Sequence, residues 1–399
     1  MRRIKALITA KNAEIRLADA ANRGPNHRTI CGEYMNIHEH QEWPKFHWDE
    51  ARMADLLADV RHRQGRLLGR MEALGFGLRE EATLQTLTQD VVKTSEIEGE
   101  QLNVAQVRSS LARRLGMDIG TLLPVDRNVE GIVEIMLDAT RQYAAPLTQE
   151  RLFAWHAALF PTGRSGMQAI TVGDWRTAAS GAMQVVSGPL GRETVHFEAP
   201  TSGRLKREMA QFLKWFNAPA ETDLVIKSAL AHFWFVTIHP FEDGNGRIAR
   251  AIADLLLARS EKTAERFYSM SAQIQRERKA YYEVLERSQK GALDITRWME
   301  WYLHCLKHAL GASEKMLEKV LRKARFWKAH EEETFNVRQR AVINRLQDGF
   351  EGKLTSSKWG KLTKCSQDTA LRDISDLVDR KVLAREEAGG RSTSYVLRD

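Results

Sequence analysis

The stretch at residues 239–250, which reads HPFEDGNGRIAR, holds one imidazole, two carboxylates, two glycines, one amide and two guanidinium groups. Apolar residues recur at helical spacing on both sides of it, over residues 225–236 and 248–256. This periodicity predicts a helix on each side, the second beginning near Asn245. The stretch therefore connects two helices, and most of its polar groups lie at the start of the second.

The residue types in this connection suit a polyphosphate. Gly244 and Gly246 leave the turn without side chains, so an anion can approach the backbone closely. The free N–H groups and the positive dipole end of the following helix attract that anion. Arg247 and Arg250 are three positions apart, share one helix face and can reach the same ligand.

Two further residues add chemistry to this anion site. Asp243 lies at its mouth, where a carboxylate can hold the magnesium ion that accompanies nucleotide phosphates. His239, just before the turn, is the natural proton acceptor. The segment GNGRIA also fits the dinucleotide fingerprint, which needs a buried strand before it and an acid about 20 positions later. A helical pattern precedes it and Glu265 is the only well-placed acid, so we disfavour a Rossmann site.

Residues 239–250 resemble, position for position, the HPFx[DE]GNGRxxR signature of Fic-family nucleotidyltransferases. The resemblance implies transfer of AMP from ATP to a protein hydroxyl, with His239 as the base and Asp243 as the magnesium ligand. It also implies ATP contacts from Phe241, Gly244, Asn245, Gly246, Arg247 and Arg250. Tyr281 and Tyr282 fall where family members often contact adenine, so both are carried over, although one is expected in the core. The resemblance covers roughly residues 122–310.

Residues 94–99, TSEIEG, close an expected helix and give Glu98 two interpretations. From the residues alone, Gly99 caps the helix and Glu98 is a surface acid. The stretch also looks like the [ST]xxxE[GN] inhibitory motif that some Fic proteins carry before the core. A glutamate on Arg250 forms a charge-assisted pair where the γ-phosphate should bind. The resemblance thus implies that Glu98 inhibits the site.

Two short β-prone runs, at residues 183–187 and 193–197, flank a Gly-Pro turn and predict a hairpin. Fic proteins have such a flap above the active site, where a target segment adds a strand to it. The resemblance therefore assigns target docking to Gln184, Val185, Val186, Thr194 and Val195. A purely structural hairpin is the alternative.

The whole chain predicts a mainly α fold. The resemblance implies a Fic-type helical core with the short hairpin flap, between an N-terminal helical domain and a C-terminal winged helix-turn-helix. The expected segments are a disordered extension (1–40), the helical domain with the inhibitory motif (41–118), the catalytic core (119–310), a linker helix (311–333) and the winged helix (334–399). Within the core, single helices are expected at 274–288 and 295–310.

The expected third helix of the C-terminal domain, residues 366–378, bears on the partner. Such helices often bind DNA, but this one carries Asp368, Asp373 and Asp376, which repel phosphates. We favour a protein partner here. A DNA-binding regulator with a nucleotide-sensing core is the alternative from another class, and the intact His239 argues against it because a pure binder needs no base.

Composition limits the setting of this activity. The 399 residues are 43% hydrophobic and 28% charged, which is ordinary for a globular protein. No apolar run approaches the roughly 18 residues of a membrane span, and three scattered cysteines indicate a reducing cytoplasm. The net charge of +8 suits phosphate ligands. The sequence predicts a cytoplasmic enzyme that uses ATP and Mg²⁺ on an unidentified protein. Removal of AMP, transfer of another nucleotide and a homodimeric state are left open.

Overall fold

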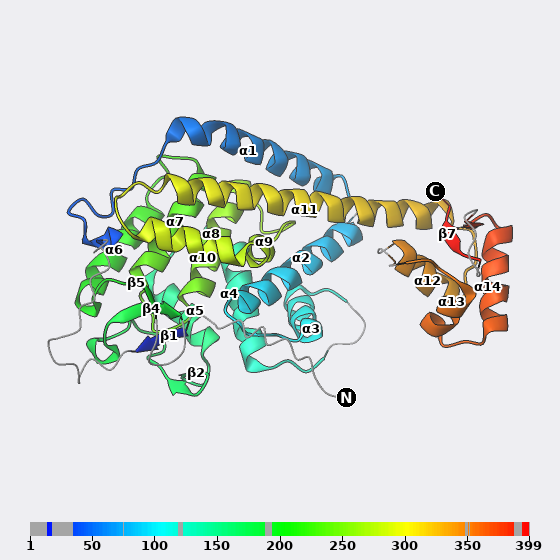
Figure 1. Ribbon diagram of the computed structural model, residues 1–399, viewed down its shortest axis with the longest axis horizontal. Helices are drawn as coiled ribbons and strands as arrows, with labels where there is room; N and C mark the ends of the chain where they lie inside the picture. The colour runs from blue at the N-terminus through cyan, green and yellow to red at the C-terminus, as the bar shows by residue number, and fades with distance from the viewer. Residues whose placement is uncertain are drawn as a thin grey trace. The chain divides into compact units, whose positions relative to one another are not determined.

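The computed structural model describes residues 14–17, 35–74, 76–118, 123–187, 194–347, 350, 352–386 and 393–398. The protein is mainly α-helical, as predicted (Figure 1). It divides into two units, Met1–Ser313 and Glu314–Asp399, and each is described by itself. Among the residues described, every helix is too short or too polar to cross a lipid bilayer.

Three helices form the N-terminal part: α1 (Glu50–Glu72), α2 (Phe76–Ile97) and α3 (Val104–Leu115). Side chains cap two of them, because Asp49 accepts the backbone N–H of Arg52 and Asn103 accepts that of Ala105. Helix α2 begins at Phe76, and Gly77 lies within its first turn. Its end, followed by Gly99 at φ 87°, places Glu98 directly after the last turn.

The core is built around α7 (Leu224–Ile238) and α8 (Asn245–Glu261). Every residue of α7 from Val225 onward is buried, and so is every residue of α8 from Arg247 to Ala258. Helices buried on all sides belong at the centre of a domain. The helices α4 (Arg127–Arg141), α5 (Gln149–Leu159) and α6 (Leu205–Asn217) pack around this pair.

Two predicted helices differ from the structure in the second half of the core. The single helix expected at 274–288 is two helices, α9 (Met270–Arg276) and α10 (Arg278–Gln289), because Glu277 leaves the helical conformation at ψ 22°. The core helix at 295–310 and the linker helix at 311–333 are instead one continuous helix, α11 (Thr296–Ala329). Gly311, which separates the two apolar patterns, keeps the helical backbone.

The expected hairpin is present as β4 (Met183–Ser187) and β5 (Thr194–Glu198), which pair antiparallel with an irregularity between Val185 and Val186. A third strand, β1 (Glu14–Leu17), pairs antiparallel with β4 and gives the order β1-β4-β5. The structure therefore differs from the disorder predicted for the N-terminal extension (1–40) at these four residues, and also at residues 35–40, which include a 3-10 helix at Ile37–Glu39. Its other residues up to 34, and the Gly-Pro turn of the hairpin, lie outside the described residues.

Two short strands and three 3-10 helices are also present in the first unit. The strands β2 (Arg164–Ser165) and β3 (Gln168–Ala169) form a small antiparallel hairpin. The 3-10 helices are η2 (Ile37–Glu39), η3 (Ala178–Ser180) and η4 (Ser202–Arg204). Hairpin β2–β3 matters for function, since Ser165 contacts the loop before α8.

The second unit follows the element order that the sequence predicts. The helices α12 (Val337–Gln347), α13 (Ser356–Thr363) and α14 (Gln367–Asp379) precede an antiparallel pair, β6 (Leu383–Arg385) and β7 (Tyr395–Leu397). Trp359, fully buried, lies in a separate core with Val342, Ile343, Ile374 and Leu377. The expected wing turn at 389–390 lies outside the described residues, and the winged-helix identification stays a prediction.

Candidate active site

The connection between α7 and α8 is held in shape by its own residues. His239 ends α7 at φ 52°, and Gly244 begins α8 at φ 82°, a conformation that favours glycine. The Asn245 side-chain amide stabilises the loop through two hydrogen bonds to the Phe241 backbone. Its Oδ1 accepts the Phe241 N–H (3.0 Å), and its Nδ2 donates to the Phe241 carbonyl (2.8 Å). The Asn245 side chain is thus used by the loop, and a nucleotide contact from this residue falls to its backbone N–H.

His239 has one ring nitrogen bonded and the other without a partner. Its Nδ1 lies 3.1 Å from the Val236 carbonyl, which can only accept, so Nδ1 carries the proton. The other nitrogen, Nε2, is buried and has no hydrogen-bond partner among the described residues. Burial lowers the pKa of the imidazole to about 4. The ring is therefore neutral at physiological pH, with the Nε2 lone pair available to take a proton.

Arg176 is a functional residue that the sequence did not reveal. Its buried guanidinium donates from Nε to the His239 carbonyl (2.7 Å) and from Nη2 to the Pro200 carbonyl. Its backbone N–H donates to the Pro240 carbonyl (3.0 Å). Burial lowers its pKa to about 10, so it stays charged at neutral pH. Arg176 thus fixes the backbone at His239.

Phe241 lies under the loop rather than facing a ligand. It is fully buried and stacks on His156, with ring centroids 4.1 Å apart and 7° between the planes. His156 accepts the Gly173 N–H at Nδ1 and donates from Nε2 to the Asp243 carbonyl (3.2 Å). The ATP contact implied for Phe241 is thus not open in this structure, because the ring fills the core.

Asp243 presents a carboxylate that is partly open to solvent. Its side chain is 31% exposed, one oxygen accepts the Ser165 hydroxyl, and the other accepts the N–H of Gly244 (2.5 Å). Magnesium favours oxygen ligands and is often bound through one carboxylate together with substrate phosphates. No group of three potential metal ligands occurs among the described residues. The donor set therefore fits a magnesium ion that arrives with a nucleotide.

Arg250 is held by the end of α2. It is buried, and it donates to the Thr94 hydroxyl (2.7 Å), the Thr94 carbonyl (3.0 Å) and Oε1 of Glu98 (2.6 Å). The Glu98–Arg250 ion pair that the sequence suggests is present in the structure. Its guanidinium Nη1 has no hydrogen-bond partner among the described residues. Arg250, on α8, is thus bonded to the end of α2 and keeps one donor group unused.

The Glu98 carboxylate lies over the glycine turn. A Cβ atom at Gly246 would stand 2.3 Å from Oε1 of Glu98 and 3.3 Å from Nη1 of Arg250. Gly246 is therefore required for this close approach. The space beside its backbone, where the sequence predicts a phosphate, holds a carboxylate instead.

Arg247 has a different carboxylate partner. Its Nη1 donates to Oε2 of Glu100 (3.0 Å), and its guanidinium lies 5.2 Å from the centroid of Phe160. The Asp243 carboxylate is farther away, with 3.9 Å between Nη2 and Oδ1. Glu100 was not among the predicted site residues. Both arginines of the signature are thus paired with acids that follow α2.

The two tyrosines carried over as adenine contacts differ in burial. Tyr281 is 2% exposed and its hydroxyl lies 2.9 Å from Nε2 of His232, so it belongs to the core. Tyr282 is half-buried, and the guanidinium of Arg278 lies 5.4 Å from its ring centroid. Burial raises the pKa of both phenols. Of the two, Tyr282 stays a candidate for adenine.

The flap residues lie on the expected strands, but one edge is already paired. Gln184, Val185 and Val186 of β4 are opposite Arg16, Ile15 and Glu14 of β1. On β5, Thr194 and Val195 are exposed. The docking role of these residues stays a prediction, and a target strand at the β4 edge must take the place of β1.

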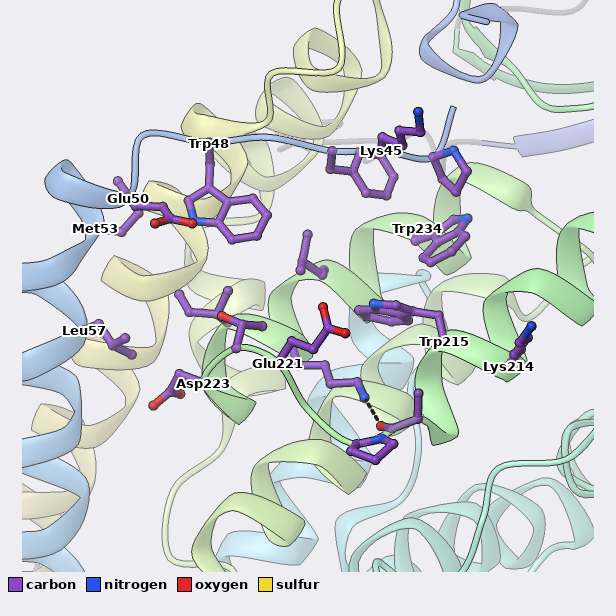
Figure 2. A pocket seen from close by; sticks show the side chains of 18 of the residues that line it. Lys45, Trp48, Glu50, Met53, Leu57, Lys214, Trp215, Glu221, Asp223 and Trp234 are labelled. Carbon is purple, nitrogen blue, oxygen red and sulfur yellow. Dashed lines mark hydrogen bonds between the residues drawn. The ribbon is translucent and has the colours of Figure 1, made fainter. Parts of the chain in front are cut away.

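A wide cavity of about 1040 Å³ lies elsewhere in the first unit. Figure 2 shows Trp215 and Trp234 beside each other on one side of it, with Trp48 across from them. Near these rings, the Lys227 ammonium donates to the Ala218 carbonyl (2.9 Å) and lies 5.1 Å from the Trp215 ring. None of residues 239–250 lines this cavity. It lacks their combination of base, glycine turn and arginines, so we place the chemistry at the α7–α8 loop.

Comparison with known families and proteins agrees with this location. Residues 146–257 match the Fic/DOC family, and residues 36–117 match a domain of unknown function, DUF4172. Residues 146–257 are therefore similar to a Fic/DOC domain. The segment that matches the Fic/DOC family contains the α7–α8 loop and the flap, whereas Glu98 and Glu100 lie in the segment that matches DUF4172.

Individual relatives are distant. The chain is 27% identical over 250 residues to the protein adenylyltransferase Fic of Culex quinquefasciatus, covering 61% of this chain and 44% of that protein. It is 27% identical over 233 residues to the protein of the same name from Drosophila ananassae (56% and 40% covered). The chain thus spans less than half the length of these relatives. Among solved structures it is similar to a Fic family protein from Desulfovibrio desulfuricans G20, with 22% identity, 89% and 98% coverage and a TM-score of 0.49.

Proposed function

We propose that the chain is a protein adenylyltransferase that transfers AMP from ATP to a Ser, Thr or Tyr hydroxyl of a target protein, and of itself. The observation that carries this proposal is the neutral His239 ring, whose Nε2 has no hydrogen-bond partner in the part of the chain that the structure describes. That nitrogen belongs to the loop that leads into a glycine-lined helix start bearing two arginines. A base beside a polyphosphate site is what an alcohol needs to attack a nucleotide.

The chain's own groups perform the steps as follows. His239 Nε2 takes the proton of the target hydroxyl while the alcohol oxygen attacks the α-phosphorus of ATP. The new bond joins that oxygen to phosphorus, the bond to the β-phosphate oxygen breaks, and pyrophosphate leaves. Backbone N–H groups at the start of α8 stabilise the charge on the α-phosphoryl oxygens. Arg247 and Arg250 bind the β- and γ-phosphates.

Asp243 is the residue that would hold magnesium in this site. When bound with the nucleotide, the ion supplies positive charge that offsets the charge of the departing pyrophosphate. The hydrogen bonds to Asp243 from Ser165 and from the Gly244 N–H orient the carboxylate toward the loop.

Glu98 inhibits the enzyme in this proposal. Its pair with Arg250 (2.6 Å) uses a donor that a γ-phosphate needs, and its carboxylate lies against Gly246. A negative group in this place repels a triphosphate and occupies its space. ATP then binds in a form that does not react, or not at all.

Labelled ATP and purified protein test the proposal. We expect weak self-labelling of the wild type, a strong increase in Glu98→Gly, and no labelling in the double variant Glu98→Gly with His239→Ala. Glu96→Gly is the matched control, because Glu96 lies on the same turn but pairs with Lys93 (2.6 Å). Its labelling should equal that of the wild type.

The outcomes separate the alternatives. Absence of label in Glu98→Gly contradicts adenylyl transfer, and equal labelling of Glu98→Gly and wild type contradicts the inhibitory role. Release of AMP from a labelled protein by the wild type, lost in Glu98→Gly, favours AMP removal at the same site.

A further inference from the structure

We propose that Glu100 is a second inhibitory carboxylate, which acts on Arg247 separately from the action of Glu98 on Arg250. This inference rests on the proposed function, since it concerns access of ATP to the same site. It starts from the observation that each arginine of the signature has its own acid, at 3.0 Å for Arg247 and 2.6 Å for Arg250.

The backbone after α2 places the two acids on different arginines. Gly99, at φ 87°, turns the chain between them. The N–H groups of Glu98 and Glu100 both donate to the Ser95 carbonyl, at 3.1 and 3.0 Å, so this turn is fastened to the last turn of α2. Both carboxylates therefore come from one short, anchored segment, and they reach side chains that lie three positions apart on α8.

The Glu100 carboxylate is held in place from two sides. Oε2 accepts Arg247 Nη1, and Oε1 lies 3.4 Å from the amide nitrogen of Asn128, at the start of α4. The Arg247 side chain is only 9% exposed, and its other acid, Asp243, is 3.9 Å away. A buried guanidinium requires a close counter-charge. Glu100 supplies this counter-charge, which a β-phosphate would supply in the complex with ATP.

Phosphate and Glu100 consequently compete for the same donor. Removing Glu98 takes the carboxylate away from Arg250 but leaves Arg247 paired with Glu100, so inhibition in the Glu98→Gly form is only partly relieved. The alternative hypothesis is that Glu100 favours nucleotide binding. If it only holds Arg247 ready for phosphate, its removal weakens nucleotide binding.

Calorimetric titration of ATP, ADP and AMP into full-length variants tests the inference without relying on turnover. In the Glu98→Gly background we add Glu100→Gln, which keeps the size of the side chain and a polar group for Asn128. We expect ATP and ADP to bind about two- to fivefold more tightly, the range of a partly exposed ion pair. AMP has no β-phosphate and should bind equally well to both forms.

The control and the contrary results are specific. Glu96→Gln in the same background removes a nearby carboxylate that faces Lys93, and it should change none of the three affinities. Unchanged or weaker ATP binding by Glu100→Gln contradicts the inference, as does an equal gain for AMP. If Glu98→Gly transfers AMP while Glu100→Gln has no effect on binding, only this inference fails. If the binding gain is seen without any AMP transfer, the proposed function fails instead.

Discussion

At the scale of single residues, the chemistry proposed for this site depends on the protonation of His239. The Val236 carbonyl holds the proton on Nδ1, and Arg176 holds the His239 carbonyl at 2.7 Å. Burial disfavours the charged imidazolium, which is why its pKa falls to about 4. The imidazole is therefore neutral, with Nε2 free of a proton, well below neutral pH.

This protonation state predicts the pH dependence of AMP transfer. The proton-free form is lost only as pH falls through about 4, so kcat/KM of the Glu98→Gly variant should be nearly constant from about pH 8 down to about 5.5. A histidine with an ordinary pKa near 6.5 would lose about tenfold by pH 5.5. Measuring ATP binding at the same pH values controls for changes in affinity. A tenfold decline of kcat/KM with constant binding contradicts the assignment.

The sequence predicted some of these residues and missed others for a physical reason. The signature at 239–250 and the nearby glycines are local, so their spacing alone indicates a base beside an anion site. Arg176, Ser165 and Glu100 act on it from 63, 78 and 147 positions away. Only the packing of helices brings such residues together, and their local sequence carries no signal of it.

At the scale of elements, the junction of α2 with the core determines whether the acids after α2 reach the arginines. Asp90, one turn before Thr94, accepts the Ser269 hydroxyl (2.6 Å) and the Ser271 N–H (3.2 Å), which join α2 to α9. Close by, the fully buried Arg266 donates to Asp254 of α8 (2.8 Å). Burial raises the pKa of the Asp90 and Asp254 carboxyl groups, and the positive charge of Arg266 opposes this rise.

Arg266 should therefore be essential for stability of the first unit. Arg266→Met leaves Asp254 and Glu261 without their buried counter-charge, and we expect a loss of about 3–5 kcal/mol in the free energy of unfolding. Arg276→Met is the matched control, since Arg276 is exposed and its guanidinium donates to the uncharged Gln273 (3.3 Å). Urea denaturation measures both. Equal urea midpoints for the two variants would show that the buried ion pairs of Arg266 with Asp254 and Glu261 do not stabilise the fold.

At the scale of the whole molecule, the chain has two units with separate cores. The sequence predicted the order of helices in both units, because their apolar periodicity is strong. It failed at Glu277, where one helix becomes two, and at Gly311, where two become one. A break of one residue hardly changes the periodicity, and a glycine in a long helix is tolerated when packing supports it.

The separate core of the second unit predicts separable stabilities. Trp359→Ala should destabilise that unit by about 3–5 kcal/mol, since it empties the centre of its core. The exposed Ser357→Ala is the control on the same helix. Calorimetry should show one unfolding transition lowered and the transition of the first unit unchanged. A single transition that shifts as a whole would contradict two independent cores.

The ion pairs of the second unit bear on its partner. The Asp373 carboxylate pairs with Arg338 (2.6 Å), and Arg380 pairs with Glu333 (2.6 Å) and Asp376 (3.0 Å). These arginines are therefore already neutralised by acids on or near α14. Phosphate contacts need unneutralised positive charge, so we continue to favour a protein partner over DNA.

ATP labelled at one chosen phosphorus tests whether the protein transfers AMP and whether this transfer needs His239. Purified Glu98→Gly protein is incubated with ATP labelled at the α-phosphorus or, separately, at the γ-phosphorus, with Glu98→Gly/His239→Ala in parallel. We predict that protein retains the α label only, and that the His239→Ala form retains neither. Retention of the γ label would contradict transfer of AMP. Retention of the α label by the His239→Ala form would contradict the role of this imidazole as the base.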